Sequence, residues 1–212
     1  MESPAAQVHG AGRRRDPATD VAIRDAVLDS IADGATLSGL SLVTVARRAG
    51  VSRNSLYRRW SSKDELYLDV LDSINLPLPA TRAETTRDGI IALLRVLAER
   101  IVDRRATAMV RALTAEAGQF PDLHRRYFEE VVAPRRRALV EVLNRGVDRG
   151  EIRRDVDVEF VAELLVSPLL ARMSAGDIAD IDPRAMSVRV VDLVLTGAET
   201  RDDAPGDGDA RR

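Results

Sequence analysis

Apolar side chains recur every three or four residues through most of this chain, and Gly, Pro and Ser stand where the pattern stops. This spacing predicts amphipathic α-helices, whereas the alternation typical of strands is rare. In the first third of the chain the predicted helices are short, and Pro77 and Pro79 separate them from the rest. These short helices cover residues 18–33, 42–49 and 53–60, and a fourth starts after Ser61 or Ser62 and reaches Ile74.

Beyond the two prolines the predicted helices are longer. Pro134 lies inside one of them, so we expect a kink or break near Val132, because proline cannot donate the backbone hydrogen bond of a helix. Pro168 should bend another for the same reason. Gly118 and Gly150 are placed to end two of these helices. The longer helices cover residues 84–102, 104–117, 121–149, 158–174 and 183–199, which makes about nine helices and an all-α fold.

Two helical units follow from this division. Residues 20–75 form the first unit and residues 80–200 the second. Residues 1–19 carry Pro, Gly and Ala without periodicity and are predicted to be a disordered arm, and residues 201–212 a flexible tail. No internal repeat is found.

The composition excludes several classes of chemistry. The chain has no cysteine and two histidines, His9 and His124, so a metal site or a histidine-dependent catalytic site has almost no material. We therefore predict no enzyme activity, no catalytic residues, no metal and no cofactor. No apolar run approaches the roughly 18 residues that span a bilayer, so we expect no membrane partner and a cytoplasmic location.

The formal net charge is −2, but the charge is unevenly distributed. Residues 35–63 contain no acidic residue and six cations. A patch of this kind attracts phosphate. Its cations are Arg47, Arg48, Arg53, Arg58, Arg59 and Lys63.

The same window has the pattern of a helix-turn-helix, in which two short helices cross steeply so that the second enters a major groove. Ala46 supplies the small side chain at the crossing, and Gly50 supplies a residue that tolerates positive φ in the turn. Val51 is an apolar plug, and Ser52 can cap the second helix, whose Leu56 points inward. Each local feature fits one geometry.

With Leu56 inward, the residues around it face outward near the start of the second helix. Arginine can read guanine and asparagine adenine, while Tyr57 and Ser55 suit phosphate oxygens. Lys63 lies at the start of the next helix, where a phosphate would also meet free backbone N–H groups. Trp60 is predicted to be a core residue, and Arg13–Arg15 a solvated tail. The predicted DNA-binding residues are Ser41, Thr44, Ser52, Arg53, Asn54, Ser55, Tyr57, Arg58 and Lys63.

The segment AGVSRNSLYRRWSSKDEL, residues 49–66, resembles the N-terminal signature of the tetracycline-repressor (TetR) family of transcriptional regulators. The matching positions include Gly50, Tyr57 and Lys63. Asn54 and Ser55 replace the Gly-Thr more common in the family, so a base preference cannot be transferred. The resemblance is close over residues 20–70 and implies a DNA-binding function for residues 20–75.

For residues 80–200 the resemblance implies ligand binding and dimerisation. The helix at 183–199 is apolar on nearly all sides, which predicts burial against both its own chain and a partner. We expect a homodimer through the last two helices. The middle helices would enclose an unknown small-molecule effector, although an apolar stripe is more often plain core. The candidate ligand contacts are Leu94, Leu97, Ile101, Met109, Arg111, Leu113, Phe120, His124, Tyr127, Phe128 and Met173.

The pattern thus favours a repressor that binds double-stranded DNA at an inverted repeat, with its two recognition helices about 34–36 Å apart. A ligand would shift the fourth helix and spoil that spacing. Two alternatives stay open: a regulator of the same fold that activates or lacks a small-molecule effector, and a helical ligand-binding protein or enzyme.

Overall fold

The computed structural model describes residues 16–79 and 83–198, and throughout these residues the chain is helical, without strands. The predicted all-α fold is confirmed. Four short helices come first: α1 (Pro17–Ala32), α2 (Leu42–Arg48), α3 (Arg53–Tyr57) and α4 (Lys63–Ser73). They are followed by α5 (Thr86–Val102), α6 (Arg104–Ala115), α7 (Pro121–Tyr127), the π-helical segment η1 (Phe128–Val132), α8 (Ala133–Asp148), α9 (Val158–Ala175) and α10 (Pro183–Ala198).

Short polar side chains fix where several helices begin. Asp16 accepts a 3.0 Å hydrogen bond from the backbone N–H of Ala18, and Ser62 accepts one of 3.1 Å from that of Glu65. Such caps satisfy donors that have no partner inside the helix. Thr85 and Asp157 play the same part for α5 and α9.

The break predicted near Val132 is present as η1, which joins α7 to α8 without a gap. Pro134 lies in the first turn of α8. Because proline has no N–H, one backbone hydrogen bond of the α-helix is missing here, and the preceding residues adopt wider π-helical turns. When α7, η1 and α8 are taken as one interrupted helix, the described residues contain nine helices, as predicted.

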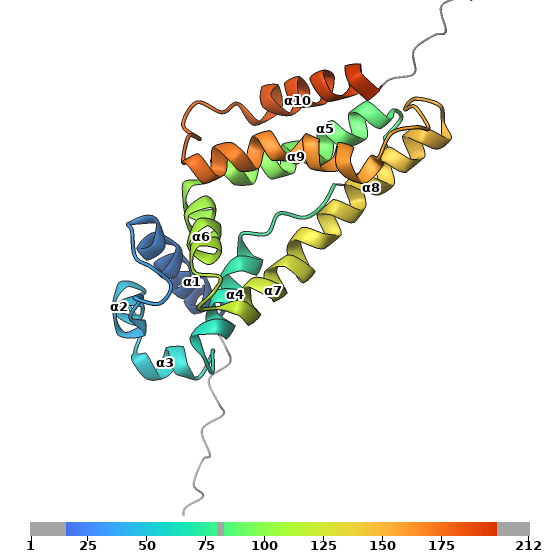
Figure 1. Ribbon diagram of the computed structural model, residues 1–212. Helices are drawn as coiled ribbons and strands as arrows, with labels where there is room; N and C mark the ends of the chain where they lie inside the picture. Colours follow the sequence, from blue (N-terminus) through green and yellow to red (C-terminus); the bar gives the residue numbers. More distant parts are fainter. Residues whose placement is uncertain (1–15, 80–82, 199–212) are drawn as a thin grey trace, which may run out of the picture.

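Helices α1–α4 form a small unit, here called the head, and helices α5–α10 form the body (Figure 1). Within the body α5 packs against α6, α8, α9 and α10, and α9 and α10 run side by side at the end of the molecule away from the head. Helix α6 descends from this end to the head and packs against α1. The head is therefore attached to the body chiefly through α6.

A few helix ends differ from the predicted ones. Helix α3 stops at Tyr57 rather than residue 60, α5 starts at Thr86 rather than residue 84, and α6 ends at Ala115 rather than residue 117. Gly118, expected to end α6, does not have a positive φ, whereas Gly34 and Gly150 do. The predicted arm, including Arg13–Arg15, and the predicted tail at 201–212 lie outside the described residues.

Candidate nucleic-acid interface

Helices α2 and α3 are joined by the turn that the sequence predicts. Gly50 has a φ of +68°, and its N–H donates to the carbonyl of Arg47 at 3.2 Å. Ser52 Oγ accepts a 3.1 Å hydrogen bond from the N–H of Ser55 and caps α3. The glycine thus reverses the chain where other residues would be strained, and the serine starts the second helix at once.

The inner face of the motif is closed by apolar side chains. Val45, Ala46, Leu56 and Trp60 are all buried. Trp60 Nε1 donates to Asp69 Oδ2 of α4 at 3.2 Å, which satisfies the polar atom of the indole. The predicted inward positions of Leu56 and Trp60 are confirmed, and they hold α3 against the rest of the head.

The outer face of α3 is open to solvent. Arg53, Asn54, Tyr57 and Arg58 are exposed, as is Thr44 on α2. The Arg53 guanidinium lies 5.3 Å from the centre of the Tyr57 ring, and its Nη2 is 3.5 Å from the tyrosine hydroxyl. The two side chains thus form one exposed donor-rich group near the start of α3.

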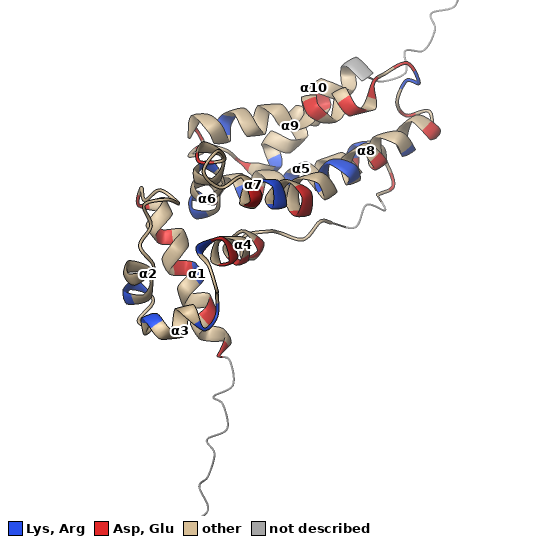
Figure 2. Cartoon of the chain, turned by 60° about the horizontal axis from the view of Figure 1, so that its bottom comes forward, with Lys and Arg blue, Asp and Glu red and all other residues tan. Residues whose placement is uncertain are grey.

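The cations of the acid-free window divide into two sets. Arg48 pairs with Asp33 of α1 at 2.9 Å, and the largely buried Arg59 pairs with Asp20 at 2.5 Å. In the part of the chain that the structure describes, Arg53, Arg58 and Arg47 have no carboxylate within ion-pair distance. Figure 2 shows basic segments on α2 and α3 and acidic ones on α1 and α4. The free positive charge therefore lies on α2 and α3.

Two predicted contacts are less free than the sequence indicates, and a third residue lacks its expected cap hydrogen bond. Lys63 Nζ donates to the carbonyl of Ser38 at 3.3 Å, and Ser55 Oγ accepts from Arg59 Nη1 at 2.8 Å. Ser41 precedes α2 as expected, but its side chain makes no cap hydrogen bond. Their contacts with DNA stay predictions, and Lys63 would have to share its ammonium group with Ser38.

A carboxylate of the body holds the turn that precedes α2. Glu116, which follows α6, accepts hydrogen bonds from the N–H of Leu37 at 2.6 Å, the N–H of Ser38 at 3.0 Å and Ser38 Oγ at 2.5 Å. Partial burial alone would raise the pKa of Glu116, but these hydrogen bonds and the charge of Lys63 outweigh it and lower the pKa. We call this group of contacts the Glu116 clamp.

Two further contacts attach the head to the body. Arg105 of α6 pairs with Asp25 at 2.6 Å and with Asp29 at 3.0 Å, both on α1. Buried Tyr67 of α4 donates to the carbonyl of Leu37 at 2.7 Å and meets the ring of Phe120 edge-on. Burial and, to a lesser degree, nearby carboxylates raise the pKa of Tyr67, so it remains a donor. The sequence analysis did not find these links, because residues 30 to 80 positions apart make them.

The predicted ligand contacts differ in how exposed they are, and their contact with a ligand stays a prediction. Arg111 and Phe128 are exposed: the guanidinium of Arg111 lies against Gly176 at the end of α9, and the ring of Phe128 stacks with His124 at 4.8 Å. Phe120 and Leu97 are half-buried. The others are core residues: Leu94, Ile101, Met109, Leu113, Tyr127 and Met173.

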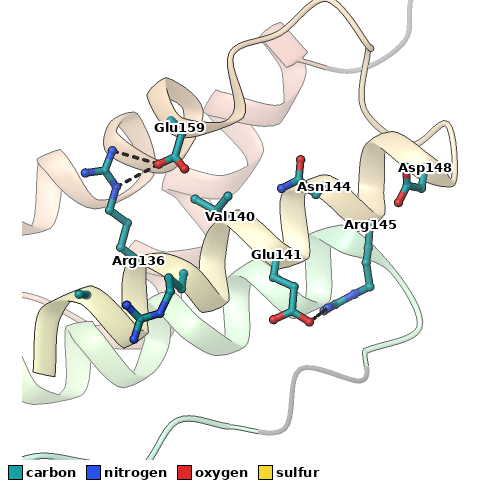
Figure 3. Close-up of a pocket in the computed structure, with 9 residues that line it drawn as sticks. Arg136, Val140, Glu141, Asn144, Arg145, Asp148 and Glu159 are labelled. Carbon is teal, nitrogen blue, oxygen red and sulfur yellow. Dashed lines mark hydrogen bonds and ion pairs between the residues drawn. The ribbon is translucent and has the colours of Figure 1, made fainter. Parts of the chain in front are cut away.

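Two hollows are found elsewhere. One, about 700 Å³, is an open groove along α8, where Arg136 pairs with Glu159 of α9 and Glu141 with Arg145 (Figure 3). The other, about 520 Å³, lies between α1, the end of α4 and the end of α5. Neither is lined by any of the eleven predicted ligand residues.

A membrane-spanning helix would need a long, almost uncharged apolar stretch, and none of the helices in the described ranges has one.

Comparison with known proteins identifies both units. Residues 37–70 match the model of the tetR family of bacterial regulatory proteins, and residues 81–194 match a tetracyclin repressor-like C-terminal domain. The chain is 30% identical to the transcriptional regulator YdeS of Bacillus subtilis over 169 residues, which is 76% of this chain and 81% of YdeS. It is also 30% identical to the regulator AqdR of Rhodococcus erythropolis over 185 residues, covering 82% and 84% of the two chains.

Solved structures share the fold at lower identity. The regulator FadR of Bacillus subtilis, solved with stearoyl-CoA, superposes with a TM-score of 0.70 at 15% identity over 84% of this chain and 99% of FadR. The ketosteroid regulator KstR2 of Mycobacterium tuberculosis gives 0.68 at 20% identity over 90% and 99%. The helix-turn-helix and the helical body thus occur together in known regulators.

Proposed function

The chain belongs to the TetR family of DNA-binding transcriptional regulators. From this premise we propose that the protein is a repressor that binds an inverted-repeat operator as a homodimer. It releases the operator when a small molecule binds. We assign DNA binding to residues 20–75, and effector binding and dimerisation to residues 80–200. The observation that carries the proposal is the exposed, charge-uncompensated face of α3 on a rigid, buried support.

The contacts with DNA divide by chemistry. Arg53 and Asn54 lie near the start of α3, the part of a recognition helix that reaches base edges. The hydroxyl of Tyr57 and the guanidinium of Arg58 suit phosphate oxygens, which fix the register of the protein on the duplex. Arg59 is a supporting residue, since it binds Asp20 and the carbonyl of Ser55.

The proposed dimer forms through α9 and α10. In these helices large apolar side chains face solvent: Phe160 is 56% exposed, Leu164 42% and Leu193 70%. The two helices pack against each other, so their exposed residues can form one surface. A second copy of this chain would cover that surface and hold the two heads at a fixed distance.

The effector and the sign of regulation are part of the proposal. FadR binds stearoyl-CoA in its crystal structure, and the relative from Mycobacteroides abscessus, 30% identical over 160 residues, is a transcriptional repressor. A regulator that activates, or that has no small-molecule effector, is the alternative. We also propose that the chain is not an enzyme.

A salt titration tests DNA binding directly. We expect the affinity for the DNA beside its own gene, measured by fluorescence anisotropy, to fall with a slope of log K against log salt near −7 for about 8 phosphate contacts per dimer. Arg53→Ala should weaken binding by roughly 10–100-fold, as expected for a lost base contact of about 1–3 kcal/mol. Arg95→Ala, which removes an exposed arginine of the body, is the matched control. A flat salt dependence, or equal loss in both variants, would exclude the proposed interface.

A further inference from the structure

Arg100 is a buried arginine without a partner. It lies in the last turn of α5, seven residues after buried Leu93 and therefore on the same inward face, and it is only 8% exposed. Among the residues that the structure describes, none forms an ion pair or hydrogen bond with its guanidinium. Its side-chain nitrogens are not among the fully buried atoms, so the stem is buried and the unpaired guanidinium is open to the cleft described next.

Arg100 lines the cleft of about 520 Å³ between α1, α4 and α5. The other charged residues of this cleft are already engaged. Arg24 pairs with Asp69 at 3.4 Å, and Glu99 pairs with Arg95 at 3.3 Å.

The remaining charges of the cleft are engaged as well. Asp25 is paired with Arg105, and Asp103 accepts from two N–H groups at the start of α6. The cleft is lined by as many carboxylates as arginines, and of its charged residues Arg100 alone has neither an ion pair nor a hydrogen bond among the described residues.

A second, half-buried cation lies close by. Arg135 of α8 donates to the side chain of Asn75, to the carbonyl of Leu76 at 2.6 Å and to the carbonyl of Val131 at 2.9 Å, all of which are neutral. Burial and the charge of Arg100 lower the pKa of Arg135. The two guanidinium groups therefore repel each other.

The walls of the cleft are partly apolar. Leu28 of α1 is buried, Ile74 after α4 is half-buried and Leu76 is 39% exposed, and all three line the cleft. A volume of about 520 Å³ lies within the range of small-molecule sites. The cleft thus offers one unpaired cation together with apolar side chains.

We propose that this cleft binds an amphiphilic anion, a carboxylate or phosphate headgroup on a short apolar chain, with Arg100 as its charged partner. The proposal rests on the proposed function, of which it names the effector class. A guanidinium can hold either headgroup with two parallel hydrogen bonds. The apolar chain would lie against Leu28, Ile74 and Leu76. Because the walls belong to both head and body, the ligand would alter the angle between them.

Calorimetry of the purified protein tests the site without DNA. Octanoate and octyl phosphate are the anionic probes, and octanamide is the uncharged probe of similar shape. We expect at least one anion to bind and octanamide to bind at least about tenfold more weakly, since charge-assisted hydrogen bonds are the stronger kind. The preferred anion tells a carboxylate effector from a phosphate ester. Failure of both anions to bind at millimolar concentration, or equal binding of octanamide, overturns the proposal.

Variants locate the binding to Arg100. Arg100→Met should weaken binding of the preferred anion at least about tenfold, whereas Arg126→Met, which removes an exposed arginine of α7 paired with Glu130 away from the cleft, should not. Arg100→Lys keeps the charge and should bind with intermediate affinity. Unchanged anion affinity in Arg100→Met, or a loss in Arg100→Lys as large as that in Arg100→Met, rejects the site.

A separate DNA-binding measurement tells this failure from failure of the proposed function. If the protein binds its operator with the expected salt dependence but no anion binds the cleft or releases the DNA, the repressor assignment stands and the effector site is rejected. The anion that binds should release the wild-type protein from the operator and leave Arg100→Met bound.

Discussion

The Glu116 clamp provides a direct test of how the head is held. Glu116→Ala removes the acceptor of three hydrogen bonds, two of them from the backbone of Leu37 and Ser38. A hydrogen bond to a charged group contributes about 1.5–3 kcal/mol when buried. Glu116 is half-buried and the Ser38 bonds are exposed, so solvent replaces part of this. We take the local loss as about 1.5 kcal/mol.

Hydrogen exchange of the Leu37 amide measures this loss, because its described acceptor is the Glu116 carboxylate. A loss of about 1.4 kcal/mol is a tenfold change, so the protection factor of Leu37 should fall about tenfold in Glu116→Ala. The control is Glu99→Ala, which removes a half-exposed carboxylate paired with Arg95 on α5. Equal protection of Leu37 in the wild-type protein and Glu116→Ala would refute the clamp.

The same assay has a defined pH dependence. The pKa of Glu116 is lowered in the folded protein from an ordinary value of 4.5. Its contribution to stability is therefore complete above pH 4.5 and is lost as pH falls through the lower, folded-state pKa. The difference in Leu37 protection between wild type and Glu116→Ala should be constant at neutral pH and vanish under more acidic conditions. A difference that persists in strong acid would contradict the role of the carboxylate.

Two further substitutions have simple expected results. Gly50→Ala should destabilise the folded protein by about 1–2 kcal/mol and lower its melting temperature by roughly 2–8 °C, because alanine is strained at a φ of +68°. No atom lies near the added Cβ, so the backbone conformation alone causes this loss. Gly118→Ala, which has the same open space but no positive φ, is the control and should show no such effect in calorimetry. Phe160→Asp should give a monomer in light scattering. Phe128→Asp, which replaces a similarly exposed side chain elsewhere, should leave the dimer intact. A dimeric Phe160→Asp would rule out the proposed interface.

The parts of the fold that the sequence predicts are those set by local rules. The turn at Gly50, the cap at Ser52 and the break before Pro134 each depend on a few adjacent residues. For this reason the helix-turn-helix could be predicted together with its inward residues. The exposed face of α3 followed from the same periodicity, since Leu56 fixes which side is buried.

Long-range pairing could not be predicted in this way. The acid-free window indicates six cations free to meet phosphate, but α1 supplies Asp20 and Asp33, which pair with Arg59 and Arg48. The candidate ligand residues were chosen mainly for apolar character; six of them are buried in the core, and their contact with a ligand stays a prediction. A signal was present for Arg100, an arginine at the inward spacing of α5, although its lack of a partner is visible only in the structure.

The positions of the clamp and the cleft make α6 the element through which a ligand would act. At its start, Arg105 is fixed to Asp25 and Asp29 of α1, and just past its end Glu116 is fixed to Leu37 and Ser38. Two attachments at opposite ends of one helix prevent the head from turning independently of it. The cleft touches the first attachment, since Arg105 and Asp25 line it. An anion held by Arg100 would therefore separate α1 from the end of α5 and tilt the head about the Glu116 clamp. Glu116→Ala should then bind the anion normally but release DNA less completely, because the pivot of that tilt is lost.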